Sequence, residues 1–272
     1  MLLKQIFEGD SYKSMIPHTD KLVEILRNGY SEYFRSQSEY VIFRGATPTS
    51  SVGIIVNPKV EGRASANTTN EYTLLMSNDP LWSKYPKRSE SIICSTSEMG
   101  SSSYGRLYMV IPPDSFRFGV VPASDVWYGF EHGISNLDFS YMDQFNNALR
   151  NMIFKIFPDA NLNMINTYEG LKKALEEITY ETLKTTSTDR NRLYEFIRNK
   201  LKTNPNINAY DVVMNEILHP EKNGFWVLNS NTEFSKLPDA TSEIWTDNTC
   251  ILINSDANGI EFKDLQKRVL ER

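Results

Sequence analysis

The sequence predicts an α+β protein in which two strand-rich parts flank a block of helices. In both flanking parts, short runs of β-branched and aromatic residues alternate with Gly, Pro and Ser turns, which is typical of strands. After about residue 135, apolar residues instead follow a helical period. The expected strands cover residues 40–43, 91–94, 106–111, 116–121, 224–228 and 244–253. We therefore expect one sheet whose strands are separated in the sequence by the helical block.

The other segments of the chain are expected to form a first helix and a long loop. A first helix is expected over about 20–35, where apolar residues recur at helical spacing. Segment 46–88 is rich in Ser, Thr, Asn, Gly and Pro and is expected to be a long loop. The chain then divides into an N-terminal helix with the first part of a β-rich core at 1–134, a helical insertion at 135–222, and the rest of the core with a C-terminal helix at 223–272.

Composition excludes several classes of function. The 34 acidic and 29 basic residues are scattered and leave a net charge of −5, so general nucleic-acid binding is not expected. A local basic pocket is conceivable only at Lys84, Lys87 and Arg88. The chain has two cysteines, no apolar run of membrane-spanning length and no secretory leader pattern, which predicts a cytoplasmic protein with reduced thiols and no membrane association.

Common catalytic motifs are missing from the sequence. It contains no Walker A, GxGxxG or GxSxG pattern, and its three histidines, His18, His132 and His219, are far apart and outside any metal-binding motif. No metal is therefore expected. Cys94 with His132 would suit a cysteine hydrolase if the fold joined them, but Cys94 continues an apolar strand run, which favours a buried structural thiol.

Three short elements follow one another in a suggestive order. Arg44 and Gly45 directly follow the expected strand 40–43, and the triplet Ser95-Thr96-Ser97 directly follows the expected strand 91–94. Glu243 directly precedes the expected strand 244–253. Each of these features is ordinary by itself, and it is their order along the chain that singles them out.

These elements resemble the Arg-Ser-Glu class of ADP-ribosyltransferases. In that family an aromatic-Arg-Gly strand, a Ser-Thr-Ser strand and a later Glu strand line one NAD cleft in a split β-sheet core. The resemblance implies that NAD is a substrate and that ADP-ribose is transferred to a macromolecular, most simply protein, acceptor. It also implies that Glu243 opposes charge on the ribose with help from Ser95, while Arg44, Gly45, Thr96 and Ser97 bind the cofactor.

The resemblance leaves further assignments open. Arg63 and Tyr72 are candidates for an additional phosphate contact and a stacking ring. Thr241 stands where arginine-modifying members of the family carry Glu or Gln, which disfavours arginine as the acceptor. Without an insertion, Asp125 or Glu131 would take the role of Glu243. The alternative to an enzyme is an interaction or structural protein with the same sheet.

Overall fold

The computed structural model describes most of the chain in two compact units. It describes residues 13–39, 41–58, 71–130, 134, 137, 142–159, 165–185, 192–237, 241–254 and 261–271. The first unit comprises residues 1–63, 85–125 and 226–272, and the second comprises residues 64–84 and 126–225. The protein is thus an α+β protein in which one unit carries the sheet and the other is built of helices.

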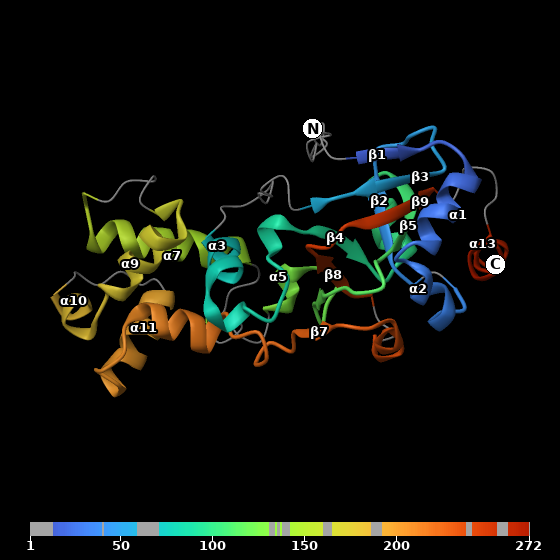
Figure 1. Ribbon diagram of the computed structural model, residues 1–272. Coiled ribbons are helices and arrows are strands. Elements are labelled where there is room, and N and C mark those ends of the chain that lie inside the picture. Colours follow the sequence, from blue (N-terminus) through green and yellow to red (C-terminus); the bar gives the residue numbers. More distant parts are fainter. Residues whose placement is uncertain are drawn as a thin grey trace. The chain divides into compact units, whose positions relative to one another are not determined.

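The first unit is organised around a nine-stranded antiparallel sheet of order β1-β3-β9-β5-β2-β4-β8-β6-β7 (Figure 1). Its strands are β1 (Lys13–Ile16), β2 (Phe43–Ala46), β3 (Gly53–Val56), β4 (Ile92–Ser95), β5 (Arg106–Ile111), β6 (Phe118–Val120), β7 (Trp226–Leu228), β8 (Glu243–Thr246) and β9 (Cys250–Asn254). Strand β8 pairs with β4, and β9 pairs with β5. Strands from before and after the helical block therefore share one sheet, as the sequence predicts.

Helices α1 (Thr19–Arg27), α2 (Ser31–Ser36) and α13 (Phe262–Leu270) pack together beside the sheet (Figure 1). Apolar residues on one side of α1 and α13 enter the core, as amphipathic helices require. The single helix expected over 20–35 is in fact two. Gly29 separates them, because its φ of 104° lies in the left-handed region that other residues rarely adopt and a helix cannot continue through it.

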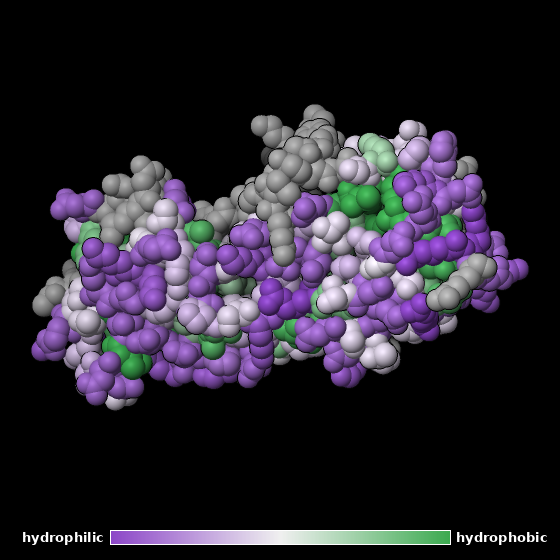
Figure 2. Space-filling model, in the orientation of Figure 1, coloured by the Kyte–Doolittle hydropathy of each residue, from purple (hydrophilic) through white to green (hydrophobic). Residues whose placement is uncertain are grey.

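Apolar surface in the first unit is concentrated on part of the sheet. Figure 2 shows hydrophobic side chains gathering over β3 and its neighbours, whereas most of the visible face is hydrophilic. Ile55, Val56 and Leu107 are partly buried and pack against the core, and Met15 on β1 is 57% exposed. These strands therefore keep some apolar side chains within reach of solvent.

The second unit is helical in the part that the structure describes. Its helices are α3 (Glu71–Asn78), α5 (Val126–Gly129), α7 (Met142–Ile156), α9 (Tyr168–Glu176), α10 (Tyr180–Thr185), α11 (Arg192–Thr203) and α12 (Ala209–Val212), with a 3-10 turn at Pro80–Trp82 and a π-helical turn at Val213–Ile217. Buried Glu71 of α3 accepts bonds of 2.8 and 2.5 Å from Arg150 of α7. None of the described helices is long and apolar enough to cross a membrane.

Two expectations about the first half of the chain need correction. The segment 46–88 is not one long loop, because it contains β3, α3 and the 3-10 turn Pro80–Trp82. The helical unit also takes in residues 64–84, which lie outside the expected insertion at 135–222. Helix α3 packs against α9 of this unit, and its buried Glu71 is ion-paired with Arg150 of α7, which is 79 residues away in the sequence.

A close contact between neighbouring strands yields a stability prediction. A Cβ added to Gly119 of β6 would lie 2.2 Å from the ring of Trp245, which is fully buried on β8. We expect Gly119→Ala to lower the free energy of unfolding by about 1–3 kcal/mol, the scale of overpacking a core. Urea denaturation measures this change.

Gly100 of α4 (Glu98–Ser102) provides the matched control. A Cβ there would meet nothing closer than 3.5 Å, and alanine favours a helix over glycine by roughly 0.5–1 kcal/mol. Gly100→Ala should therefore be neutral or slightly stabilising. Equal stability of Gly119→Ala and the parent would contradict the packing described for β6 and β8.

Candidate functional site

The three elements singled out in the sequence lie on adjacent strands. Phe43 of β2 is the register partner of Ser95 of β4, and Ser95 is the register partner of Glu243 of β8. Directly opposite residues of antiparallel strands have Cα atoms roughly 4.5–5.5 Å apart and point to the same face. Ser95 and Glu243 are therefore neighbours on one face of the sheet, although both stand at strand ends.

The sheet opens between β2 and β4. These strands are joined by the single pair Phe43 and Ser95, whereas β2 pairs with β5 over its whole length. Beyond that pair, Nη1 of Arg44 donates a hydrogen bond to the carbonyl oxygen of Ile93 in β4. A side chain thus satisfies a backbone group where the regular ladder has ended. The predicted strand 40–43 is therefore shifted: β2 runs from Phe43 to Ala46, and Arg44 is its second residue, next to this opening, rather than the end of the strand.

Gly45 is required by packing within the chain. A Cβ at this position would lie 2.0 Å from the carbonyl oxygen of Ser101 in α4 and 2.9 Å from Cβ of Tyr104. The predicted reason for this glycine was close approach of a ligand. The structure provides a different reason, since the backbone of α4 already makes the close approach.

The Ser-Thr-Ser triplet organises the backbone around Glu243. Thr96 Oγ1 accepts a 2.8 Å hydrogen bond from the amide of Ser242, and the Thr96 amide donates a 3.0 Å bond to the Ser242 carbonyl. Ser97 caps α4 by accepting a bond from the Gly100 amide, and Ser95 Oγ accepts one from the Ser97 amide. Thr96 thereby holds the residue directly before Glu243.

Glu243 is buried and ion-paired with Arg88. The bond joins Arg88 Nη1 to Glu243 Oε1, and each side chain is 8% exposed. Arg88 begins the 3-10 helix η4 (Arg88–Glu90), and its Cζ lies 5.7 Å from the ring centroid of Trp245. The site therefore contains a buried carboxylate with its counter-charge, held against an aromatic ring.

In the sequence, Lys84, Lys87 and Arg88 are the candidates for a local basic pocket. In the structure each cation pairs with a different carboxylate, Lys84 with Glu221 and Lys87 with Glu90. The two lysines are about half exposed, so the local basic pocket is not formed. Arg88 pairs with Glu243, which is 155 residues away, and a single sequence contains no signal for such a distant pairing.

The other candidates lie in different places. Asp125 is half-buried near the start of α5, outside any strand, and Ala123 just before it accepts a 2.8 Å bond from the Glu243 amide. Thr241 is half-buried in the segment leading into β8.

Tyr72 is 1% exposed in the core of the second unit, with its ring against Phe130, so it is not the solvent-accessible loop residue that the sequence predicts. Arg63, Glu131 and His132 lie outside the described residues.

Two buried hydroxyls at the site lack hydrogen-bond partners within the described part of the chain. They are Ser101 Oγ, on the turn of α4 that faces Gly45, and Ser242 Oγ, next to Glu243. Their residues are 3% and 1% exposed. An unsatisfied buried hydroxyl costs free energy, so such groups call for an explanation.

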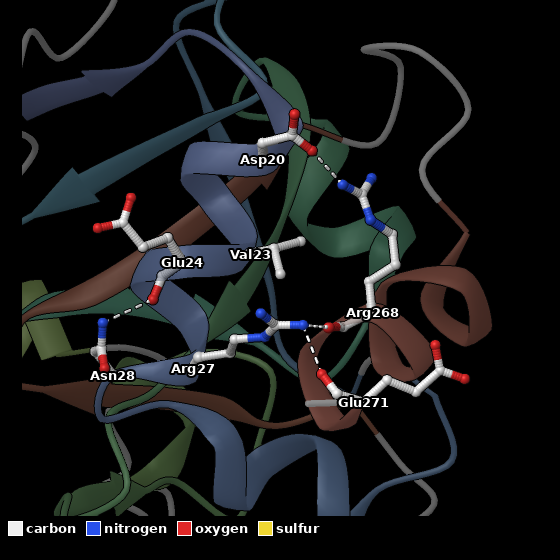
Figure 3. Close-up of a pocket in the computed structure, with 7 residues that line it drawn as sticks. All are labelled: Asp20, Val23, Glu24, Arg27, Asn28, Arg268 and Glu271. Atoms are coloured by element: carbon white, nitrogen blue, oxygen red, sulfur yellow. Dashed lines mark hydrogen bonds and ion pairs between the residues drawn. The ribbon is translucent and has the colours of Figure 1, made fainter.

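A separate pocket of about 400 Å³ lies between α1 and α13 (Figure 3). Arg27 donates 2.6 Å bonds to the carbonyls of Arg268 and Glu271, and Arg268 is paired with Asp20. Both cations thus fasten the C-terminal helix to α1. This pocket shares no residue with the strand-end site.

The comparisons with known proteins add no relative. No family model matches the chain, and no similar protein was found among curated sequences or solved structures. Within the described ranges, no group of three His, Cys, Asp or Glu residues could hold a metal ion. The site must therefore be interpreted from its own geometry.

Both cysteines lie in the core of the first unit, which provides a test of the hydrolase alternative. Cys94 is 4% exposed on β4 and Cys250 is fully buried on β9, where burial raises the pKa of the Cys250 thiol. Iodoacetamide modifies thiolates, so we expect neither cysteine to react appreciably in the folded protein at pH 7.5 and both to react in guanidinium. Mass spectrometry of the labelled peptides measures this. Rapid labelling of Cys94 alone in the folded protein would instead support a cysteine hydrolase with Cys94 as the nucleophile.

Proposed function

We propose that this protein is a mono-ADP-ribosyltransferase that takes ADP-ribose from NAD and transfers it to a protein acceptor in the cytoplasm. The observation that carries the proposal is the row Phe43, Ser95 and Glu243 across β2, β4 and β8. The fold proposed with it is the split sheet of the ADP-ribosyltransferases. The opening of the sheet after the single β2–β4 pair supports that fold.

The chemistry assigns Glu243 an electrostatic role. The bond between C1 of the ribose and the nicotinamide nitrogen breaks, and its electron pair leaves with nicotinamide, which becomes neutral. Positive charge then develops on the ribose, where a nearby carboxylate stabilises it. The acceptor nucleophile forms a new bond to C1 and loses its proton to solvent. Glu243 supplies the carboxylate, and Thr96 holds the backbone that precedes it.

The neighbouring polar groups suit the rest of the dinucleotide. Arg44 and Gly45 within β2 and the Ser95-Thr96-Ser97 triplet at the end of β4 are all partly exposed, so a ligand can reach them. Arg44 donates one bond to the carbonyl of Ile93 in β4, and its guanidinium is the type of planar donor group that suits a diphosphate.

The first functional prediction concerns turnover. Glu243→Gln keeps the shape of the side chain and an acceptor for Arg88 but removes the negative charge, which is needed most in the transition state. We expect kcat for NAD hydrolysis or transfer to fall by about 10²–10³-fold, the usual scale for one preorganised electrostatic group, while KM for NAD changes little. Steady-state release of nicotinamide measures both constants.

Asp125→Asn is the matched control for that experiment. It makes the same carboxylate-to-amide change near the site but off the strands, so kcat should stay at the parental value. Thermal denaturation verifies that each variant is folded. If Asp125→Asn abolishes activity and a folded Glu243→Gln retains it, the catalytic carboxylate has been assigned to the wrong residue.

The second functional prediction concerns binding. Arg44→Ala removes the charge-assisted bonds offered to the diphosphate, so we expect the Kd for NAD to rise roughly tenfold or more, since one hydrogen bond to a charged group contributes about 1.5–3 kcal/mol. Isothermal titration calorimetry measures it. Arg35→Ala is the control, because Arg35 is an exposed arginine on α2 paired with Glu32 in the adjacent helical turn. Unchanged affinity in Arg44→Ala would remove Arg44 from the site, and lack of NAD binding by the parent would favour a non-enzymatic interaction protein.

A further inference from the structure

We propose that Arg88 is the positioning residue for the catalytic carboxylate: it sets the orientation of Glu243 toward the ribose and makes no contact with the substrate itself. This inference rests on the proposed function, because it assigns Arg88 a part in the same site. Neither the strand pattern nor the family resemblance points to this residue.

The ion pair constrains the carboxylate directly. Nη1 of Arg88 contacts Oε1 of Glu243, so a guanidinium holds one of the two carboxylate oxygens. The backbone at Glu243 is fixed separately, by pairing of β8 with β4 on one side and by hydrogen bonds to residues 121–123 on the other. A glutamate side chain otherwise rotates about three bonds. At 8% exposure, solvent cannot take over the role of the guanidinium. The carboxylate plane therefore depends on where Arg88 lies.

Arg88 is in turn placed by a rigid aromatic support. Trp245 lies two residues after Glu243 on the same face of β8, and its Nε1 donates a 2.9 Å bond to the carbonyl oxygen of Pro86. Tyr85 stacks on the indole with ring planes 15° apart, and Gly119 supports it from the neighbouring strand. These contacts fasten segment 85–88 over Trp245. The guanidinium lies 5.7 Å from the same ring, in the range of a cation–π contact.

The arrangement differs from that of an ordinary surface ion pair. Most other pairs in the described parts join residues three or four apart along a helix and involve exposed side chains. Arg88 and Glu243 are both buried and come from segments 155 residues apart in the sequence. Such a pair fixes geometry at a point where the fold brings distant segments together, and this is what an oriented catalytic carboxylate requires.

The test compares three variants in steady-state NAD hydrolysis and transfer. Arg88→Gln removes the charge, Arg88→Lys keeps the charge but not the planar fork, and Lys87→Gln removes the same charge from a half-exposed neighbour paired with Glu90. We expect kcat to fall on the order of 10²-fold in Arg88→Gln, the scale of a misplaced catalytic group. Arg88→Lys should recover part of that loss, and Lys87→Gln should match the parent. KM for NAD should stay within about twofold throughout, because a positioning residue acts after binding.

Each outcome decides the inference. A folded Arg88→Gln with parental kcat would overturn it and leave the proposed function intact, provided that Glu243→Gln is inactive. A rise in KM with unchanged kcat would also overturn it, since Arg88 would then be a binding residue. If Arg88→Gln does not fold, Arg88→Lys decides alone, and parental kcat in that variant contradicts positioning. Absence of NAD hydrolysis and transfer in the parent would overturn the proposed function and this inference together.

Discussion

The buried ion pair between Arg88 and Glu243 is the interaction on which the candidate site depends. Two charges that are 8% exposed are stable in a protein interior only if they are paired, and removal of one partner typically costs about 3–5 kcal/mol. The pair therefore holds β8 and segment 85–88 in one arrangement. Thr96, which bonds the residue before Glu243, adds a second connection from β4. A change at any of these points would alter the position of the carboxylate.

The same contacts connect the site to the core of the sheet. Trp245 lies between the ion pair and Gly119, so the packing of β6 against β8 supports the placement of Arg88. On the other side of β4, the opening toward β2 leaves Arg44 and the Ser-Thr-Ser triplet partly exposed. The buried carboxylate of Glu243 thus lies beside partly exposed polar groups on the neighbouring strands.

Much of this could be predicted from the sequence, and the remainder has identifiable physical reasons. The β-branched runs and the change to a helical period correctly predicted one sheet interrupted by helices, because these periods reflect burial on one face. Gly29 was overlooked, since a left-handed glycine inside an apolar helical pattern changes the fold without changing that pattern. Helix α3 is not visible in the sequence because it is held by tertiary burial, with Tyr72, Leu75 and Met76 in the core of the helical unit, rather than by a local propensity.

The candidate site, too, could be predicted from the sequence only in part. Arg44, Ser95 and Glu243 were chosen for their order and strand-end positions, and the register of β2, β4 and β8 brings their strands side by side. The role of Arg88 was not predictable, because an arginine in a short basic segment is indistinguishable by sequence from a solvated one. Gly45 is predicted as a cofactor-binding residue, and the structure shows that packing against Ser101 of the same chain already requires a glycine there.

The central claim is that the ends of β2, β4 and β8 form one NAD site. The most direct test is a titration of the ¹⁵N-labelled protein with NAD, followed through backbone amide shifts in a spectrum suited to a 31.3 kDa chain. We predict saturable shifts that cluster at residues 43–46, 95–101 and 241–243, with the helical unit largely unaffected. Saturable shifts confined to the helical unit, or no shifts at millimolar NAD, would contradict this account.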